Sequence, residues 1–502
     1  MTGIDWIKGY VKECIIENPD KAPMYQQIYE DMCPEDRAQI ASILYTGFER
    51  KDAVFVVSHI LYYTSIEYFQ KIALDLLLMF DHDCFLGATF DCVMSHYGIH
   101  YYSEKRALRA KNKFYLSKLL QTEYPYLPYK DCNRNRVVLV VPQLLSSLHA
   151  PTNVALNFLY TFTELEVEYL LFSCPSDYEI PHDIWHTSWT ENSIELCKTH
   201  IINYSFRDKV FHGYQICTSE QKVKEYDMML RMIHLFNPMC VIDMGARLPI
   251  TDLCIDFTRV VAFPLSIQCP VSGANLLLRL GRTDATLEEE YLQALESHQK
   301  QVFLERAIPV VFKEDESNVT RTDLGIREDS FLIALVGNRL AQEIDSAFIQ
   351  ILMRILQTQP SIEIVIIGDS AELEGMFSDT IFMDRIHFAG YQENLMAAYK
   401  LVDLYVNPFR KGGGFSSKIA LFAQVPVVTL PDCDVAYNAG PDFVVSHDAY
   451  ADTIIRYASD PDYYSQMKRL TEKFDIREQQ EEMKEFVQYV LETAEKIFAA
   501  DN

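Results

Sequence analysis

Basic residues are scarce in this sequence relative to acidic ones. The 502 residues include 45 Lys and Arg against 71 Asp and Glu, which gives a formal net charge of −26 at pH 7. A surface that binds nucleic acid or an anionic membrane needs an excess of positive charge. The composition therefore argues against both kinds of partner, while it allows a local basic pocket for a phosphate-bearing ligand.

Closely spaced cysteine pairs and long apolar stretches are also missing. The 12 cysteines are scattered without a CxxC pair, which is typical of reduced thiols rather than of a disulfide framework. A membrane span needs about 18 apolar residues, and the nearest approach, Ile72 to Phe80, contains Asp75. Because the N-terminus has no basic segment followed by an apolar one, we expect no signal peptide and a cytoplasmic location.

Residues 1–130 carry the residue spacing of helices. Ile4, Ile7 and Val11 repeat at helical intervals, and the segment from Ala53 to Phe80 is apolar with few helix breakers, as in buried helices. We predict an all-helical N-terminal domain over 1–130.

From Arg136 onward, apolar runs alternate with helical segments. Strands are expected at 137–141, 166–172, 240–245 and 259–263, and then, in a second series, at 331–337, 362–368, 385–390 and 403–407. A charged helical segment is expected over 284–305, and a polar amphipathic helix over 478–499. Strands that alternate with helices indicate parallel sheets. We predict an α/β fold with one Rossmann-like domain over 136–315, a second over 324–475, a cleft between them, and a C-terminal helix within 476–502.

A glycine-rich segment follows the strand expected at 403–407. Residues 410–418 read RKGGGFSSK and precede a short predicted helix. Glycine allows a positive φ and a close approach of ligand to backbone, and the two serines stand where N-caps are expected. A helix start also offers unpaired N–H groups and a positive dipole end. The pattern is typical of a phosphate-binding loop, although a tight turn alone explains the glycines equally well.

Several segments together resemble a GT-B glycosyltransferase. More closely, they resemble glycosyltransferase family 41, which includes the protein O-GlcNAc transferases and the bacterial adhesin glucosyltransferases. Residues 414–418 resemble the family's diphosphate loop, residues 336–345 (VGNRLAQEID) the first loop of its nucleotide-binding domain, and residues 147–151 (SLHAP) its histidine-containing loop. The similarity covers roughly residues 136–475, and the adhesin glucosyltransferases also carry an all-helical N-terminal domain.

Three positions depart from the family pattern. Glu343 stands where the family has a lysine that contacts the donor's phosphates, Ala420 where it has a ribose-binding aspartate, and Lys418 where it has a glycine. An uncompensated Glu343 beside a diphosphate would cost on the order of several kcal/mol at a partly buried site. We hypothesise that Lys418 and Arg339 together replace the missing lysine.

The resemblance implies transfer of a hexose or N-acetylhexosamine from a UDP-sugar to a protein acceptor, such as a bacterial surface adhesin. It implies inversion at the anomeric carbon, no metal and no cofactor besides the donor substrate, and it leaves homo- and hetero-oligomers open. The acceptor-side catalytic candidate is His149, although a histidine in a loop is more often simply a surface residue. The implied donor-binding residues are Arg339, Gly413, Gly414, Phe415, Ser416, Ser417 and Lys418.

Other interpretations stay open at this point. Glu343 and Ala420 favour a catalytically inactive pseudo-glycosyltransferase that binds or stabilises a subunit of a glycosylation or export complex. A transferase that acts on a glycan or lipid carrier would keep the same donor site. Metal binding has weaker support: DxD patterns occur at 81–83 and 432–434, and the spacing of Cys84, Cys92, His96 and His100 fits no standard zinc site.

Overall fold

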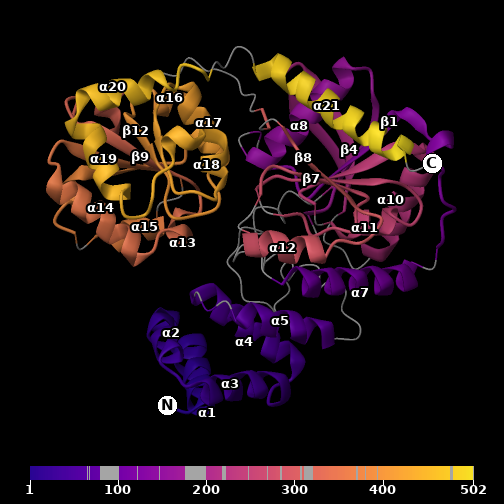
Figure 1. Cartoon of the computed structure of the whole chain (residues 1–502), viewed down its shortest axis with the longest axis horizontal. Helices are drawn as coiled ribbons and strands as arrows, with labels where there is room; N and C mark the ends of the chain where they lie inside the picture. Colours follow the sequence, from indigo (N-terminus) through magenta and orange to yellow (C-terminus); the bar gives the residue numbers. More distant parts are fainter. Residues whose placement is uncertain are drawn as a thin grey trace. The chain divides into compact units, whose positions relative to one another are not determined.

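A computed structural model gives the fold of the chain (Figure 1). It describes residues 1–64, 66, 68–79, 101–120, 122–145, 147, 149–175, 199–216, 222–246, 248–267, 269–282, 285–305, 308–309, 320–368, 371–378, 380–392, 394–474 and 479–500. The chain divides into two compact units. The first comprises Met1–Ser146, Phe162–Phe303 and Leu491–Asn502, and the second comprises Ser147–Thr161 and Leu304–Val490.

The N-terminal part of the first unit is helical wherever it is described, as predicted. Its α-helices are α1 Gly3–Tyr10, α2 Ala22–Glu30, α3 Pro34–Thr46, α4 Arg50–Tyr63, α5 Tyr68–Met79 and α7 Tyr102–Leu120, with a π-helix, η1, at Val11–Glu17. The core forms around Trp6, whose ring stacks on Tyr10 at 5.1 Å and on Phe69 at 6.0 Å between centroids. Aromatic rings in such arrangements contribute beyond the area they bury.

An eight-stranded sheet forms the rest of the first unit, in the order β3-β4-β2-β1-β5-β6-β7-β8. The strands are β1 Asn133–Val141, β2 Glu168–Ser173, β3 Ile201–Phe206, β4 Lys209–Gln215, β5 Pro238–Met244, β6 Val260–Phe263, β7 Leu276–Arg279 and β8 Lys300–Phe303. The associated helices are α8 Ala150–Glu164, α10 Lys222–Phe236, α11 Pro249–Cys254 and α12 Ala285–Gln293. All strand pairs are parallel except β3 with β4, and the predicted strands β1, β2, β5 and β6 are confirmed.

The charged helix predicted over 284–305 is only partly correct. Helix α12 ends at Gln293, and residues 300–303 form β8, which pairs with β7 at the edge of the sheet. An edge strand is partly solvated, so it lacks the apolar run that identifies a central strand. The hairpin of β3 and β4 escaped sequence analysis for the same reason, since its residues alternate between exposed and buried positions.

The basic face of α7 is neutralised inside the first unit. Arg109 forms a buried ion pair with Asp252 of α11 at 2.7 Å. Arg106 donates to the Gln299 side chain at 2.7 Å and to the Ser272 carbonyl at 3.2 Å. These guanidinium groups therefore join the last N-terminal helix to the first sheet.

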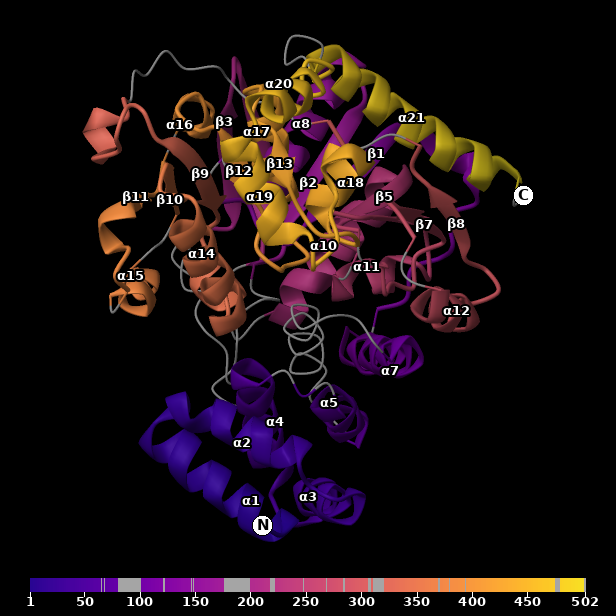
Figure 2. The same ribbon diagram turned by 60° about the vertical axis from the view of Figure 1, so that its left-hand side comes forward.

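The second unit contains a five-stranded parallel sheet in the order β11-β10-β9-β12-β13, which can be followed from left to right in Figure 2. The strands are β9 Phe331–Val336, β10 Ile362–Ile367, β11 Ile386–Gly390, β12 Leu404–Val406 and β13 Val427–Val428. All four strands predicted in this half are confirmed, and β9, β10 and β12 have the buried apolar runs on which the prediction rested. Together with the first sheet, this sheet confirms two Rossmann-like regions preceded by helices.

Helices α14 and α19 lie on one side of this sheet, and α17 and α18 lie on the other (Figure 1). The helices that follow β8 in the chain are α13 Leu340–Glu343, α14 Ser346–Thr358, α15 Ala371–Phe377, α16 Leu395–Tyr399, α17 Gly414–Phe422, α18 Asp434–Ala439, α19 Tyr450–Ser459, α20 Pro461–Arg469 and α21 Gln479–Ala500. Helix α14 begins where Asp345, its N-cap, accepts a hydrogen bond from the Phe348 N–H at 2.7 Å. Among the described residues, no helix is long and apolar enough to cross a membrane.

Asp243, at the carboxyl end of β5, is a fully buried carboxylate with one oxygen satisfied. Its Oδ2 accepts from the Thr251 hydroxyl at 2.7 Å and from the Leu248 N–H at 3.2 Å, whereas Oδ1 has no hydrogen-bond partner among the described residues. Burial raises the pKa of this carboxyl from 3.8 to about 6. Between about pH 4 and 6 the native state therefore binds a proton that the unfolded state has lost, so stability falls as the pH rises.

We predict that Asp243→Asn stabilises the protein at pH 7 by up to about 3 kcal/mol, because it removes a buried charge and keeps an acceptor for Thr251. Denaturant unfolding between pH 4 and 7 measures the effect, and the wild-type decline across this range should flatten. Asp252→Asn is the contrasting variant: it removes an anionic partner of buried Arg109 and should destabilise the fold. Equal losses in both variants would contradict the assignment of a raised pKa to Asp243.

Candidate functional site

The glycine-rich segment lies at the carboxyl edge of the second sheet, where the strand order reverses. From β9 the chain continues through β10 and β11 on one side, and then returns to β12 and β13 on the other. The loops that follow β9 and β12 thus leave neighbouring strands in different directions, which is where open parallel sheets bind ligands. Arg410, in the loop after β12, donates from Nη2 to the carbonyl of Val336 at the end of β9, at 2.7 Å.

The start of α17 presents unpaired N–H groups at this edge. The N-cap is Gly413, and the first hydrogen bond of the helix runs from the Ser417 N–H to the Gly413 carbonyl at 3.0 Å. The N–H groups of Gly414, Phe415 and Ser416 have no acceptor among the described residues. Together with the positive end of the helix dipole, three such donors form a site suited to a phosphate.

Glycine is required at position 413 for two reasons. Its φ of +95° lies in the left-handed region, which side chains with a Cβ rarely adopt. A Cβ there would lie 2.8 Å from both Arg410 Nη2 and Asn407 Oδ1. Gly412 differs, because the nearest atom to its would-be Cβ is Arg339 Nη2 at 3.8 Å.

The prediction that Ser416 and Ser417 cap the helix is wrong. Ser416 Oγ donates to the Gly413 carbonyl at 3.0 Å, and Ser417 Oγ donates to the Gly414 carbonyl at 2.9 Å. Serine hydroxyls commonly bond back to the preceding turn in this way, and here Gly413 takes the cap position instead. Ser417 is fully buried, so only Ser416 keeps partial exposure at the edge.

Arg410 is a buried support beneath the loop. Only 6% of its side chain is exposed. Its Nε donates to Asn407 Oδ1 at 2.9 Å, its Nη1 to Glu343 Oε2 at 2.5 Å, and its Nη2 to the Tyr405 hydroxyl at 3.1 Å. Burial opposes its charge, but Tyr405 and Glu343 hold the pKa of Arg410 above its ordinary value.

The negative charge of Glu343, where the family pattern has a lysine, is compensated by two arginines. Its Oε2 pairs with Arg410, and its Oε1 lies 3.2 Å from Arg339 Nη2. The Arg339 side chain is 46% exposed, and its Nη2 lies next to Gly412. Two guanidinium groups and one carboxylate leave a net positive charge beside the loop.

Lys418 does not join Arg339 at the loop. Its side chain is buried, and its ammonium group donates to the carbonyl of Ile308. Burial lowers its pKa to about 8, although the negative charge of Glu482 opposes the shift. Of the two cations in our hypothesis, the structure brings only Arg339 to the loop. Ala420, the third departure, is fully buried within α17.

His149 directly precedes α8 in the loop after β1. Its Nδ1 lies 2.9 Å from the Thr152 hydroxyl. Burial, and to a smaller extent the positive charge of Arg339, lowers its pKa to about 4. The imidazole is therefore neutral at pH 7 and can accept a proton.

No group of three or more potential metal ligands occurs among the described residues. The DxD pattern at 81–83 and the set Cys84, Cys92, His96 and His100 lie outside the described residues. In the second DxD pattern, the Asp432 carbonyl accepts a hydrogen bond from Lys411 at 3.0 Å, and Cys433 serves as the N-cap of α18.

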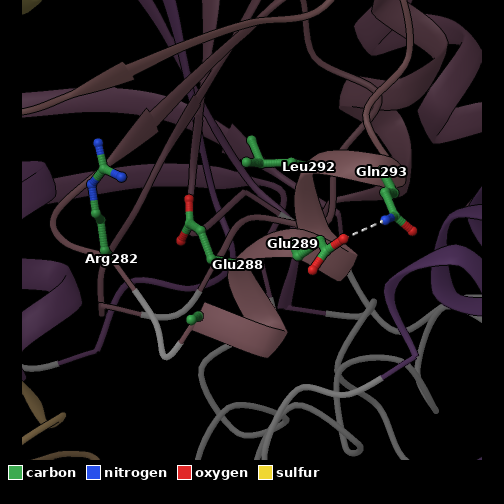
Figure 3. Close-up of a pocket in the computed structure, with 6 residues that line it drawn as sticks. Arg282, Glu288, Glu289, Leu292 and Gln293 are labelled. Atoms are coloured by element: carbon green, nitrogen blue, oxygen red, sulfur yellow. Dashed lines mark hydrogen bonds between the residues drawn. The ribbon is translucent and has the colours of Figure 1, made fainter.

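A cavity of about 620 Å³ lies along α12 in the first unit (Figure 3). Three of its polar side chains are paired: Glu288 receives two hydrogen bonds from Arg279, at 2.6 and 2.8 Å, and Gln293 donates to Glu289 at 3.1 Å. The guanidinium of Arg282 lies over the Phe303 ring, 5.0 Å from its centroid. These side chains do not converge on a ligand position, so the glycine-rich loop remains the better candidate.

Residues 331–460, from β9 to the end of α19, match the sequence profile of a family described as "Glycosyl transferases group 1". The match contains Arg339, Glu343 and the entire glycine-rich loop. The chain carries a glycosyltransferase group 1 domain. The matched domain family agrees with the resemblance seen in the sequence, and the glycine-rich loop lies within the matched residues.

Three solved structures are similar to this chain, and the first of them, whose TM-score exceeds 0.5, supports the fold. An O-GlcNAc transferase mutant of Thermobaculum terrenum is 13% identical with a TM-score of 0.52, and the alignment covers 100% of this chain and 99% of that chain. HepE of Anabaena with UDP bound has 12% identity and a TM-score of 0.48, over 71% of this chain and 99% of that one. The pneumococcal O-GlcNAc transferase GtfA with UDP and GlcNAc has 11% identity and a TM-score of 0.46, with the same coverages. The comparison with curated proteins gives no significant match.

Sequence analysis missed the supporting residues of this glycosyltransferase's donor loop. It assigned Arg410 no supporting role, and it left out Asn407 and Tyr405, which hold the Arg410 guanidinium. One sequence feature could have indicated this arrangement. Side chains alternate between the two faces of a strand, so Tyr405 and Asn407, two residues apart at the end of the predicted strand 403–407, lie on the same face. Nothing local indicates that Arg410 turns inward toward them.

We predict that Gly413→Ala destabilises the second domain by about 1–3 kcal/mol, because alanine must adopt a positive φ and displace Arg410. Thermal denaturation measures the loss. Gly412→Ala is the matched control and should change stability by less than about 0.5 kcal/mol, since its Cβ meets no atom closer than 3.8 Å. Equal stability of the two variants would show that the tight contacts around Gly413 are not maintained in solution.

Proposed function

We propose that this glycosyltransferase moves a hexose or N-acetylhexosamine from a UDP-sugar to a protein side chain, with inversion and without a metal ion. The observation that carries the donor half of the proposal is the start of α17, with three unpaired N–H groups and the exposed guanidinium of Arg339 beside them. The acceptor half rests on the resemblance to family 41, and a bacterial surface adhesin is the acceptor class it suggests.

The donor loop suits the charge that develops during transfer. Cleavage of the bond between the anomeric carbon and the diphosphate leaves negative charge on the departing phosphate. Fixed N–H donors and a planar guanidinium stabilise such charge best when they are in place before the reaction. Arg339 and the N–H groups of Gly414, Phe415 and Ser416 supply both kinds of donor, so this chemistry does not require a metal ion.

His149 suits the acceptor side of the reaction. A neutral imidazole accepts the proton that a protein hydroxyl loses as it attacks the sugar. Its Nδ1 is engaged with Thr152, whereas Nε2 has no hydrogen bond to a described residue. Intact-protein mass spectrometry of a candidate adhesin incubated with UDP-glucose or UDP-N-acetylglucosamine tests the acceptor class. Transfer to a glycan or lipid extract, with none to protein, would favour a carrier acceptor instead.

An inactive, partner-binding role has one remaining structural argument. Ala420 is fully buried in α17, so this position offers no carboxylate to a ribose. The two functions separate in a single assay, since an inactive relative can bind UDP but neither hydrolyses nor transfers a UDP-sugar.

We predict that Arg339→Ala weakens UDP binding by about tenfold or more, because it removes a charge-assisted hydrogen bond to the diphosphate. Isothermal titration calorimetry measures the dissociation constant. Arg354→Ala is the matched control, since Arg354 is an exposed arginine of α14 paired with Asp452 at 2.7 Å. Comparable losses in both variants would indicate a general charge effect, and absence of UDP binding in the wild type would contradict the donor proposal.

We predict that the acidic limb of the kcat/KM profile falls as the pH drops through about 4, rather than near the ordinary histidine value, because His149 must be neutral to accept a proton. Initial transfer rates across a pH series provide the test, within the range in which the fold is intact. His149→Ala should lower kcat at all pH values and leave the UDP dissociation constant unchanged. A variant with wild-type kcat would remove His149 from the mechanism.

A further inference from the structure

We propose that Glu343 is a positioning residue of the donor site, whose carboxylate holds Arg339 beside the glycine-rich loop and Arg410 beneath it. The inference rests on the proposed function, because it assigns Glu343 a role in binding a nucleoside diphosphate. It reverses the expectation from the sequence, in which a carboxylate at this position repels the ligand.

The two carboxylate oxygens of Glu343 serve two different arginines. Oε2 lies 2.5 Å from Nη1 of Arg410, and Oε1 lies 3.2 Å from Nη2 of Arg339. Glu343 is the last residue of α13, and Arg339 is the N-cap of the same short helix. The carboxylate therefore connects an exposed guanidinium to a buried one across a single helical turn.

The buried end of this triad is rigid. Arg410 is also bonded to Asn407, Tyr405 and the Val336 carbonyl, so its guanidinium cannot rotate without breaking several hydrogen bonds. Because Arg410 holds the Glu343 carboxylate in place, that carboxylate can in turn hold the guanidinium of Arg339. Arg339 has no other ion-pair partner among the described residues, and its Nη2 lies beside Gly412.

Glu343 has two opposite effects on a bound diphosphate: its charge repels the ligand, and its contact with Arg339 positions a group that attracts it. The second effect is the larger. One carboxylate between two guanidinium groups leaves a net positive charge, so the attraction for a diphosphate persists. An exposed arginine without an anchor samples many rotamers, and fixing its planar group in advance reduces the entropy lost on binding. Glu343 therefore adds more to binding through the orientation of Arg339 than it subtracts through its own charge.

The decisive experiment measures UDP and UMP binding to Glu343→Gln by calorimetry. If Glu343 only repels the ligand, removal of its charge tightens UDP binding. If it positions Arg339, the dissociation constant for UDP rises about five- to tenfold, while that for UMP, which lacks the second phosphate, changes much less. Glu374→Gln is the matched control, because it removes one exposed carboxylate from α15 of the same domain. It should leave both dissociation constants unchanged.

Three outcomes would contradict either the proposed function or the positioning role of Glu343. Wild-type protein that fails to bind UDP contradicts the proposed function itself. Wild-type binding together with equal or tighter binding by Glu343→Gln overturns the positioning role alone. Equal weakening of UDP and UMP overturns it as well, because that result indicates general disruption of the site.

Two further variants extend the test, and the second applies even if Glu343→Gln does not fold. In the Arg339→Ala background, Glu343→Gln should weaken UDP binding much less than it does in the wild type, since the residue to be positioned is absent. Arg339→Lys keeps the charge at the exposed end but loses the planar group. It should weaken UDP binding several-fold at an unchanged Tm, and unchanged binding would overturn the proposal.

Discussion

The buried guanidinium of Arg410 is the interaction on which the donor side of the structure depends. A charged group removed from water is stable only when its hydrogen bonds are satisfied. Here the acceptors come from three separate places in the chain: the end of β9 at Val336, the strand end at Asn407, and α13 at Glu343. One side chain thus ties the loops after β9 and β12 together, and it leaves no room for a Cβ at Gly413.

This internal bonding leaves the opposite, solvent-facing side of the loop for a ligand. Because the donors of Arg410 are used within the protein, the donors left for a ligand are the backbone N–H groups at the start of α17, which have no acceptor among the described residues, and the half-exposed side chain of Arg339. Backbone donors held by a rigid support need little reorganisation when charge develops on a departing phosphate. The loop therefore combines two sets of groups. The charged network around Arg410 supports it from within the protein, and the donors offered to a ligand are mainly backbone N–H groups.

The sequence predicted the two sheets well because a buried parallel strand is apolar along its whole length, as in β1, β9 and β10. It did not predict β7 and β8, which have four residues each, or the partly exposed β3–β4 hairpin. It predicted the glycine-rich loop between a strand and a helix, because a glycine run before a helix start is a local signal. It missed the supporting role of Arg410 and misassigned Ser416, Ser417 and Lys418, because the direction of each side chain depends on partners distant in the sequence, such as the Ile308 carbonyl. Such partners become visible only in the fold.

A comparison with a family one position at a time can misjudge a charged binding site, because the effect of each charge depends on partners that are distant in the sequence. Glu343 stands where the family has a cation, and its charge alone would repel a phosphate. Both of its carboxylate oxygens, however, are paired with arginines, one with Arg339 and the other with Arg410. Arg410 also compensates the buried carboxylate more completely than an exposed lysine would, since it reaches Glu343 at low exposure. Ala420 is a different kind of departure, because no neighbouring group restores a carboxylate inside a packed helix. Under the proposed function, a bound ribose would need partners outside α17, because Ala420 offers no polar side chain.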